Sequence, residues 1–411
     1  MERSTNLINF VFEDLENCFN LTACTQKNTS GLPRFCPSPL AQKIIMKKLG
    51  YATNQNIESN FIVAVGVNNS PEDWATGELF EFLPKKTKQS LVNNRALLLI
   101  DQSLEGYHDD CIWSYLHEQC SCHDVKASNI IYVTGNLKAD DQYEVWHKQN
   151  IYIEKINVVP FANFEDDIYR RAKTLHIDVS VGEHLKYKRK SNVVKDYNCM
   201  QKRQRNHRIW LYHELFKRRI LNKGICSMNK FSKEPPMLEG HSLQGKSFKS
   251  CRKILPVRAY GKSNNKRSDR FYIDRIQKKL YLDTWVTVVS EASFADEDNT
   301  LFLSEKLFKP IACRHPFIVF GNRHSLTKLR SMGYKTFEGF IDESYDSLPT
   351  LERFSAVMES IEKIIAIKDK AAWFNQMKDI LDHNYKTLQI NSQSINPAFK
   401  RVEDIYGSKF L

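Results

Sequence analysis

The stretch TWVTVVSEASFADEDNTLFLSEKLFKPIACRHPFIVFG, residues 284–321, places two apolar runs around a polar middle. The runs at 285–289 and 317–320 are short and rich in β-branched and aromatic residues, which predicts buried strands. Residues 304–312 have apolar positions at helical spacing, so we expect a helix there. A helix between two buried strands is typical of a parallel α/β sheet.

Polar residues in this stretch stand where α/β proteins bind ligands. Glu291 follows the first strand, and open parallel sheets bind ligands at the carboxyl ends of their strands. Ser304 is a favourable helix N-cap, which leaves Glu305 and Lys306 in the first turn, at the positive end of the helix dipole. This arrangement suits a nucleotide diphosphate, because Lys306 can face phosphate oxygens while Glu305 accepts hydrogen bonds from ribose hydroxyls. A capped helix with a solvated first turn is the alternative.

The same alternation extends toward both ends of the chain and predicts three regions. Residues 1–184 form an N-terminal Rossmann-like domain, 185–350 a second one, and 351–411 a helical segment that packs back on the domains. Within the first region we expect strands at 61–67, 96–100, 130–133 and 153–159, and helices at 110–118 and 139–148. The basic run at 185–208 is interpreted as a linker or as the entry to the second domain, and the polar stretch 228–265 as a long surface excursion.

Composition narrows the class of protein. The 411 residues include 60 Lys and Arg against 48 Asp and Glu, a net charge of +12, so part of the surface should attract anions. Only 15 residues are glycine, which argues against a glycine-rich phosphate loop. The first residues lack a signal-peptide pattern, and no run of about 18 apolar residues follows. We therefore expect a soluble protein without a transmembrane segment, located in the cytoplasm, or in the host cytoplasm if the protein is viral.

Three short motifs resemble a known family. SEAS at 290–293, FLSEK at 302–306 and PFIV at 316–319 are similar, in order and spacing, to the donor-site signature of the α-1,3-fucosyltransferases, roughly FENS, YVTEK and PVV. The chain looks like a divergent, viral or phage-type member, with Ala292 where the family has Asn and Ser304 where it has Thr. The resemblance implies an α/β GT-B-like fold, with two Rossmann-like domains facing a central cleft and a helical C-terminal segment.

The resemblance also implies an activity and a donor site. The expected reaction is an inverting, metal-independent transfer of a sugar, with fucose the leading candidate, from a GDP-sugar to a glycan hydroxyl. By position in the family pattern, Arg208 and Lys306 would hold the diphosphate, with Arg205 and Arg203 as alternatives to Arg208. Glu305 would bind the ribose and Glu291 the donor sugar. The nucleotide sugar is the substrate, and no separate cofactor or metal is expected.

Inverting transfer needs a general base, which in this family comes from the acceptor domain. The run LLLID at 97–101 ends a predicted strand, and Glu105 follows four residues later. Glu105 is the first candidate for the base and Asp101 the second. Both could instead be ordinary loop and cap acids, since a carboxylate after a strand is common.

Three other patterns suggest different functions. Residues 240–247, GHSLQGKS, match the P-loop expression GxxxxGK[ST], but Pro235 and Pro236 precede them, and a P-loop follows a buried strand. A cluster of possible zinc ligands lacks any CxxC pair, which favours buried thiols over a metal site; its members are His108, Cys111, His117, Cys120, Cys122 and His123. The basic tract at 186–270 keeps open a non-catalytic binder of nucleic acid or anionic glycan, although the absence of a nucleic-acid motif disfavours nucleic acid. Acceptor, linkage and oligomeric state stay open.

Overall fold

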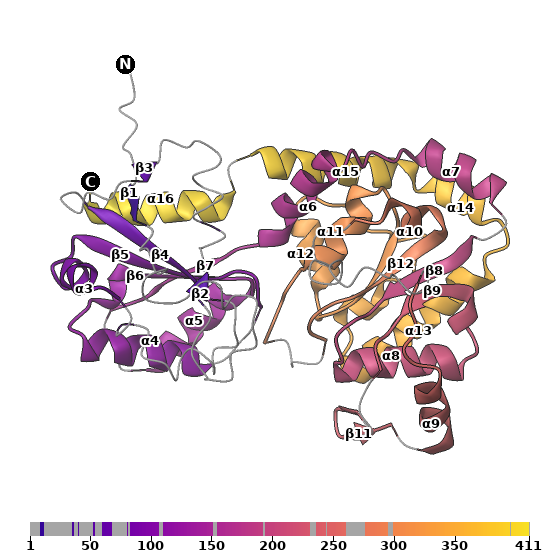
Figure 1. Ribbon diagram of the computed structural model, residues 1–411, viewed down its shortest axis with the longest axis horizontal. Coiled ribbons are helices and arrows are strands. Elements are labelled where there is room, and N and C mark those ends of the chain that lie inside the picture. The colour runs from indigo at the N-terminus through magenta and orange to yellow at the C-terminus, as the bar shows by residue number, and fades with distance from the viewer. Residues whose placement is uncertain are drawn as a thin grey trace. The chain divides into compact units, whose positions relative to one another are not determined.

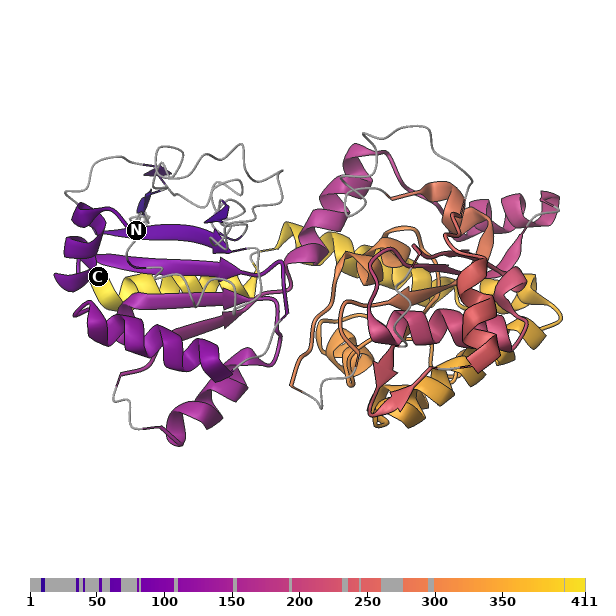
Figure 2. The ribbon, with the colours of Figure 1, turned by 60° about the horizontal axis from the view of Figure 1, so that its bottom comes forward.

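A computed structural model of the chain describes residues 9–11, 35–36, 40, 52–53, 60–67, 80, 83–106, 110–150, 154–191, 194–230, 236–243, 245–259, 276–294, 299–394 and 396–410. The chain forms two compact units (Figures 1 and 2). The first unit comprises residues 1–163 and 395–411, and the second comprises 164–394.

The first unit is built on a parallel sheet. Its strand order is β3 (Ala52–Thr53), β1 (Asn9–Val11), β4 (Phe61–Val67), β5 (Ala96–Gln102), β6 (Ile130–Thr134) and β7 (Asn157–Pro160), and β2 (Phe35–Cys36) pairs antiparallel with β4. Every residue of β4, β5 and β6 is buried, which is typical of strands covered on both faces. These strands are therefore continuous apolar runs, and the predicted strand at 61–67 matches β4 residue for residue.

Alternate residues of these strands face two separate cores. One set, which includes Val63 and Leu98, packs with α4 (Asp110–Cys122) and α5 (Ala139–Lys148). Both helices were predicted. Ile62 and Leu97 face the other way and pack with Phe399 and Val402 of α16 (Pro397–Phe410). In Figure 2 this last helix of the chain, in yellow, lies along the sheet of the first unit. It joins the first unit because the apolar face of a parallel sheet must be covered.

The second unit has a four-stranded parallel sheet in the order β13 (Phe317–Phe320), β12 (Thr284–Ser290), β8 (Lys195–Met200) and β9 (Gly224–Ser227). Helices α8 (Asn206–Lys217) and α13 (Thr350–Ala366) lie on one side of it, and α10 (Lys278–Leu282) and α11 (Glu305–Ala312) lie on the other (Figure 1). The two Rossmann-like units and the C-terminal helices confirm the predicted fold class; the central cleft stays a prediction.

The segment 185–208, expected to be a linker or the entry to the second domain, is not a linker. Its residues form the end of α7 (Val181–Lys190), all of β8 and the start of α8. The basic composition misled because Lys188 is buried: its ammonium donates to the carbonyl oxygens of Tyr281 at 2.8 Å and Leu282 at 2.9 Å, and to that of Thr284. A cation satisfied by three carbonyls can lie inside a fold although its sequence reads as solvated.

The division between the units differs from the boundary expected at residue 184. Helix α6 (Asn163–Thr174) belongs to the second unit apart from its first residue. The Glu165 carboxylate there accepts hydrogen bonds from the Tyr334 hydroxyl at 2.5 Å and the Asn391 amide at 2.6 Å. The helical segment expected at 351–411 is present but divided: α13, α14 (Lys370–Gln376) and α15 (Lys378–Gln393) lie in the second unit, and α16 lies in the first.

Among the residues that the structure describes, no helix combines the length and the apolar composition needed to cross a bilayer.

Candidate functional site

The N-terminus of α11 lies at the carboxyl edge of the second sheet. Ser304 caps the helix as predicted, with its hydroxyl oxygen accepting a hydrogen bond from the Lys306 backbone N–H at 3.3 Å. The cap leaves Glu305 and Lys306 in the first turn, where the helix dipole is positive. Ser304, Glu305 and Lys306 therefore lie together at one helix end, as expected from the stretch 284–321.

Glu291 holds this cap in place from the end of β12. Its side chain is fully buried, and its carboxylate accepts hydrogen bonds from the Ser304 N–H at 3.0 Å, from the Ser304 hydroxyl and from the Ala292 N–H at 3.3 Å. Burial raises the pKa of Glu291, while Lys306 and the bonds from Ser304 oppose the rise. The carboxylate expected to contact the donor sugar is thus turned toward the helix cap.

A glycine makes room for this carboxylate. A Cβ atom at Gly321, directly after β13, would lie 3.0 Å from both Cβ and Cγ of Glu291. A larger residue at this position would therefore crowd the Glu291 side chain and Val319, whose Cγ1 would lie 3.3 Å from the added Cβ.

The start of α8 holds the backbone where it leaves β12. Arg208 is 4% exposed and donates from Nε at 3.2 Å and from Nη2 at 2.7 Å to the Glu291 carbonyl oxygen. Burial, helped by the nearby Arg205, lowers the pKa of Arg208 to about 10. His207 contacts the same carbonyl through Nε2 at 3.2 Å, and burial lowers its pKa to about 3, so this ring is neutral and donates. The guanidinium of Arg205 donates to the Ala292 carbonyl.

Glu305 and Lys306 form a charged pair beside the cap. The Lys306 ammonium lies 3.1 Å from a Glu305 carboxylate oxygen and 3.0 Å from the Ser304 hydroxyl. Burial acts to raise the pKa of Glu305, but Lys306 and Lys309 outweigh it and the pKa is lowered. Lys306 is half-buried, Arg205 is half-buried and Arg203 is exposed. The predicted donor-binding residues Arg205, Arg208, Glu291, Glu305 and Lys306 are therefore close together.

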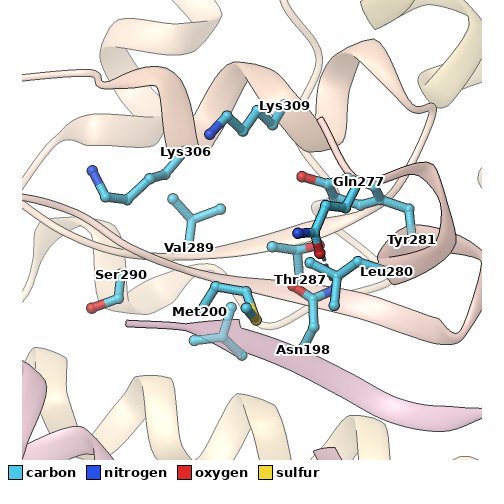
Figure 3. A pocket seen from close by; sticks show the side chains of 11 residues that line it. Asn198, Met200, Gln277, Leu280, Tyr281, Thr287, Val289, Ser290, Lys306 and Lys309 are labelled. Carbon is cyan, nitrogen blue, oxygen red and sulfur yellow. Dashed lines mark hydrogen bonds between the residues drawn. The ribbon is translucent and has the colours of Figure 1, made fainter. Parts of the chain in front are cut away.

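A pocket opens next to this pair, between α10, α11 and the strands β8 and β12. Figure 3 shows Lys306 and Lys309 of α11 on one side of Val289, and Asn198 and Met200 of β8 on the other. The lining combines cations, amides, hydroxyls and apolar side chains; its residues are Asn198, Met200, Gln277, Leu280, Tyr281, Thr287, Val288, Val289, Ser290, Lys306 and Lys309. Such a mixture is typical of ligand pockets, in which a few polar groups orient a ligand over an apolar surface.

Two amides near this pocket were missed from the sequence because they belong to the segment expected to be a linker or domain entry. Asn198 is fully buried, and its Nδ2 donates to the Thr284 hydroxyl at 2.8 Å and the Thr287 hydroxyl at 3.0 Å. Gln201, which follows β8, donates from Nε2 to the Ser290 hydroxyl at 3.3 Å. Polar residues inside a parallel strand were the available signal, because a central strand tolerates them only where they are hydrogen-bonded.

The two base candidates lie in the first unit, at the carboxyl end of β5. Asp101 is 1% exposed, and its carboxylate accepts hydrogen bonds from the backbone N–H groups of Leu40 at 2.7 Å and Ser103 at 2.9 Å. Glu105 lies in the following loop and is partly exposed, while its carbonyl accepts from the Gly135 N–H at 3.0 Å. Of the two residues, Glu105 is the more exposed.

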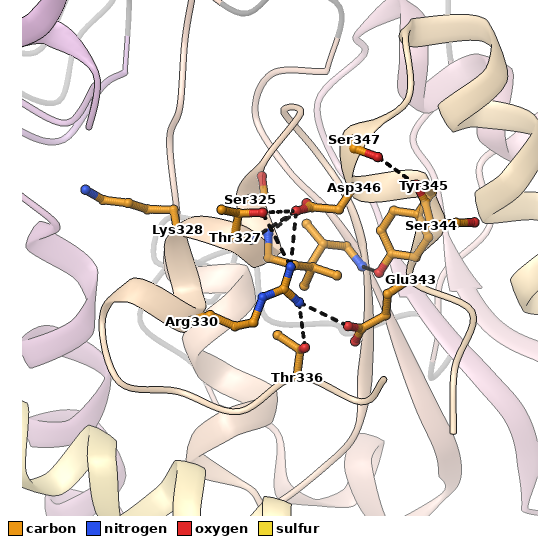
Figure 4. Close-up of polar contacts among 12 residues, drawn as sticks. Ser325, Thr327, Lys328, Arg330, Thr336, Glu343, Ser344, Tyr345, Asp346 and Ser347 are labelled. Carbon is orange, nitrogen blue, oxygen red and sulfur yellow. Dashed lines mark hydrogen bonds and ion pairs between the residues drawn. The ribbon is translucent and has the colours of Figure 1, made fainter. Parts of the chain in front are cut away.

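The acidic segment after α12 (Ser325–Ser331) caps that helix. The Asp346 carboxylate accepts hydrogen bonds from the backbone N–H groups of Leu326 at 2.8 Å and Thr327 at 2.9 Å (Figure 4). Glu343 accepts from the Phe337 N–H at 2.6 Å and lies 3.4 Å from Arg330. These two acids therefore stabilise a loop and a helix end.

The P-loop-like segment and the His/Cys cluster have other surroundings. Residues 240–247 include β11 (His241–Ser242) and the start of α9 (Gly245–Lys253). The described strand before them, β10 (Met237–Leu238), pairs antiparallel with β11 in a hairpin and is not part of the parallel sheet, whereas a P-loop follows a strand of such a sheet. His117 contacts the Tyr143 hydroxyl at 3.0 Å, and burial lowers its pKa to about 4. Burial raises the pKa of the Cys120 thiol to about 12. His108 lies outside the described residues.

Comparison with known proteins supplies no family. No family model matches the chain, and no curated protein matches it. Among solved structures it is similar to a UDP-forming α,α-trehalose-phosphate synthase from Burkholderia xenovorans, with 9% identity over 90% of this chain and 77% of that chain and a TM-score of 0.43. A second structure of such a synthase from the same organism, in complex with glucose-6-phosphate, has 8% identity, coverage of 98% and 100%, and a TM-score of 0.42. The function of this chain must therefore be inferred from its own residues.

Proposed function

We propose that this chain is a glycosyltransferase that binds a nucleotide sugar at the carboxyl edge of the sheet in its second unit. The observation that carries the proposal is the Glu305–Lys306 pair, which the buried bond between Glu291 and Ser304 holds at the N-terminus of α11, beside a pocket. A helix N-terminus with a lysine stabilises phosphate oxygens, and a neighbouring carboxylate accepts hydrogen bonds from ribose hydroxyls.

The site residues divide into two kinds in this proposal. In it, Lys306 and the partly exposed Arg205 bind the diphosphate. Glu305, which is 8% exposed and paired with Lys306, is assigned to the ribose only through the family resemblance. Arg208 and Glu291 act as positioning residues instead of contacting the donor, because Arg208 donates to a backbone carbonyl and Glu291 is fully buried against the cap. Such positioning matters because transition-state stabilisation depends on donors that are already oriented.

A more specific proposal, which names the donor and the base, rests on the resemblance to the α-1,3-fucosyltransferases. The acceptor hydroxyl loses its proton to Glu105, with Asp101 as the second candidate, and the acceptor oxygen attacks the anomeric carbon of a GDP-sugar, with fucose the leading sugar. The bond from that carbon to the diphosphate oxygen breaks, and GDP leaves with inversion. Lys306 and Arg205 offset the charge that develops on the diphosphate, so the reaction does not require a metal ion.

Calorimetric titration of the full chain with GDP, UDP and ADP, with and without Mg²⁺, tests this function. We expect one nucleoside diphosphate, GDP in the finer proposal, to bind independently of Mg²⁺. Selective binding of UDP would keep the glycosyltransferase proposal and reject the GDP donor. The absence of binding by all three nucleotides would reject the donor site and favour the non-catalytic binder of polyanions.

A further inference from the structure

A basic lobe projects from the second unit on the side of α8. The α9 lobe, residues 236–243 and 245–259, contains the β10–β11 hairpin and α9 (Figure 1). Trp210 Nε1 donates to the Pro236 carbonyl at 3.1 Å, and His213 lies 3.1 Å from the Ser247 hydroxyl. The α9 residues Phe248 and Cys251 are buried. The lobe is therefore a folded part of the unit, anchored to α8.

Cations dominate the α9 lobe and the end of α8 beside it. Nine of them are exposed or half-exposed. Arg218 is paired with Glu214 and Glu362, and Arg258 lies near the end of the lobe. The other seven are called the basic face: Lys217, Arg219, Lys223, Lys246, Lys249, Arg252 and Lys253. Glu214 lies next to them but is within 3.5 Å of both Lys217 and Arg218, and Glu239 lies at the turn of the hairpin. The basic face therefore has a strong excess of positive charge.

A shallow hollow with an apolar part lies at the basic face. Phe216, Leu221 and Ile254 form its apolar part; its other lining residues are Lys217, Arg219, Asn222 and Ser247. Ile254 is 44% exposed. Lys246, Lys249 and Lys253 recur at intervals of three and four residues, so they share the outer side of α9.

We propose that the basic face binds the surface of an anionic lipid bilayer. Lysines near such a surface are attracted by anionic headgroups, and an aliphatic side chain among them can enter the interface. Single-stranded nucleic acid is bound on exposed aromatic rings. Within the described part of the chain, no aromatic side chain is among the large apolar ones that are exposed, whereas Met237 and Ile254 of the α9 lobe are. Phe216, the one aromatic residue beside the basic face that lines the hollow, is half-buried. These side chains favour the bilayer over nucleic acid.

Flotation of the full chain with vesicles tests the proposal. We expect binding to phosphatidylcholine vesicles that contain about 30% phosphatidylserine, no binding to pure phosphatidylcholine, and weaker binding as salt rises from about 0.1 to about 0.5 M. The triple variant Lys246→Ala/Lys249→Ala/Lys253→Ala should lose about a hundredfold in affinity, since each lysine contributes roughly fivefold. Ile254→Ser should weaken binding several-fold at unchanged charge.

The control removes the same charge elsewhere in the second unit. Lys368, Lys378 and Lys386 are exposed around α14 and α15, and their triple alanine variant should bind vesicles as the wild type does. Equal loss in both triple variants would overturn the assignment to the α9 lobe, and so would wild-type binding to neutral vesicles at the same strength. Binding to a single-stranded or duplex oligonucleotide without binding to anionic vesicles would identify a nucleic-acid surface instead. Circular dichroism confirms that each variant is folded.

Discussion

The buried carboxylate of Glu291 accepts hydrogen bonds from both the backbone N–H and the hydroxyl of Ser304, thirteen residues further along the chain. This contact joins the end of β12 to the start of α11 and so determines where the Glu305–Lys306 pair lies. The contact is therefore the first target for mutation.

Glu291→Gln should lower the free energy of unfolding by about 1–3 kcal/mol. Each carboxylate oxygen accepts a backbone N–H, from Ser304 or from Ala292, so the amide NH2 group of Gln would face a donor whichever oxygen it replaces. Urea unfolding measures the change, with Glu359→Gln on the exposed part of α13 as the control. Unchanged stability in Glu291→Gln would show that the contact with Ser304 does not hold the cap.

Gly321→Ala should disturb the same contact without altering a charge. The added Cβ would lie 3.0 Å from two carbons of Glu291, and overpacking of this kind costs about 1–3 kcal/mol. Gly182→Ala in α7 is the matched control, because its Cβ would meet only the Ser180 hydroxyl at 3.9 Å. The midpoint of thermal unfolding should be lower in Gly321→Ala than in Gly182→Ala. A Gly321→Ala protein as stable as the wild type would contradict the prediction.

Acidification should destabilise the second unit through His207. Its pKa in the folded protein, about 3, lies below the ordinary value of 6.5, so the unfolded chain takes up the proton first and stability falls as the pH falls from about 6.5 toward 3. Between pH 7 and 5 this group alone contributes a loss of about 2 kcal/mol. His207→Gln keeps a donor for the Glu291 carbonyl and should reduce the loss by that amount, whereas the exposed His241→Gln should not.

Lys306→Ala should weaken nucleoside diphosphate binding by about tenfold or more, because a charged hydrogen bond to phosphate is lost. Lys386→Ala, at an exposed helical position of α15, is the control and should bind like the wild type. Calorimetry measures both. Equal affinities in the two variants would remove Lys306 from the donor site and with it the main support for the proposed function.

Glu105→Gln should leave nucleotide binding unchanged and reduce sugar transfer by about a hundredfold or more, as expected on removal of a general base. Release of the nucleoside diphosphate in the presence of acceptor measures transfer, and Glu118→Gln on the exposed side of α4 is the control. Asp101→Asn should instead lower stability, because its carboxylate accepts two backbone hydrogen bonds. Full activity in Glu105→Gln would point to another base.

Local sequence by itself determined the strands and the helix cap. The apolar runs at 61–67 and 317–320 are buried on both faces, so their composition alone marks them, and Ser304 caps α11 because capping depends on neighbouring residues. Only the tertiary structure decided which polar and charged side chains are buried in the core. Lys188 and Asn198 are buried because carbonyls and hydroxyls about ninety residues away satisfy them, and α16 covers a sheet whose strands lie far back in the chain. Glu291 likewise became a support for the cap, since burial against Gly321 and Ser304 is a property of the folded chain and not of a motif.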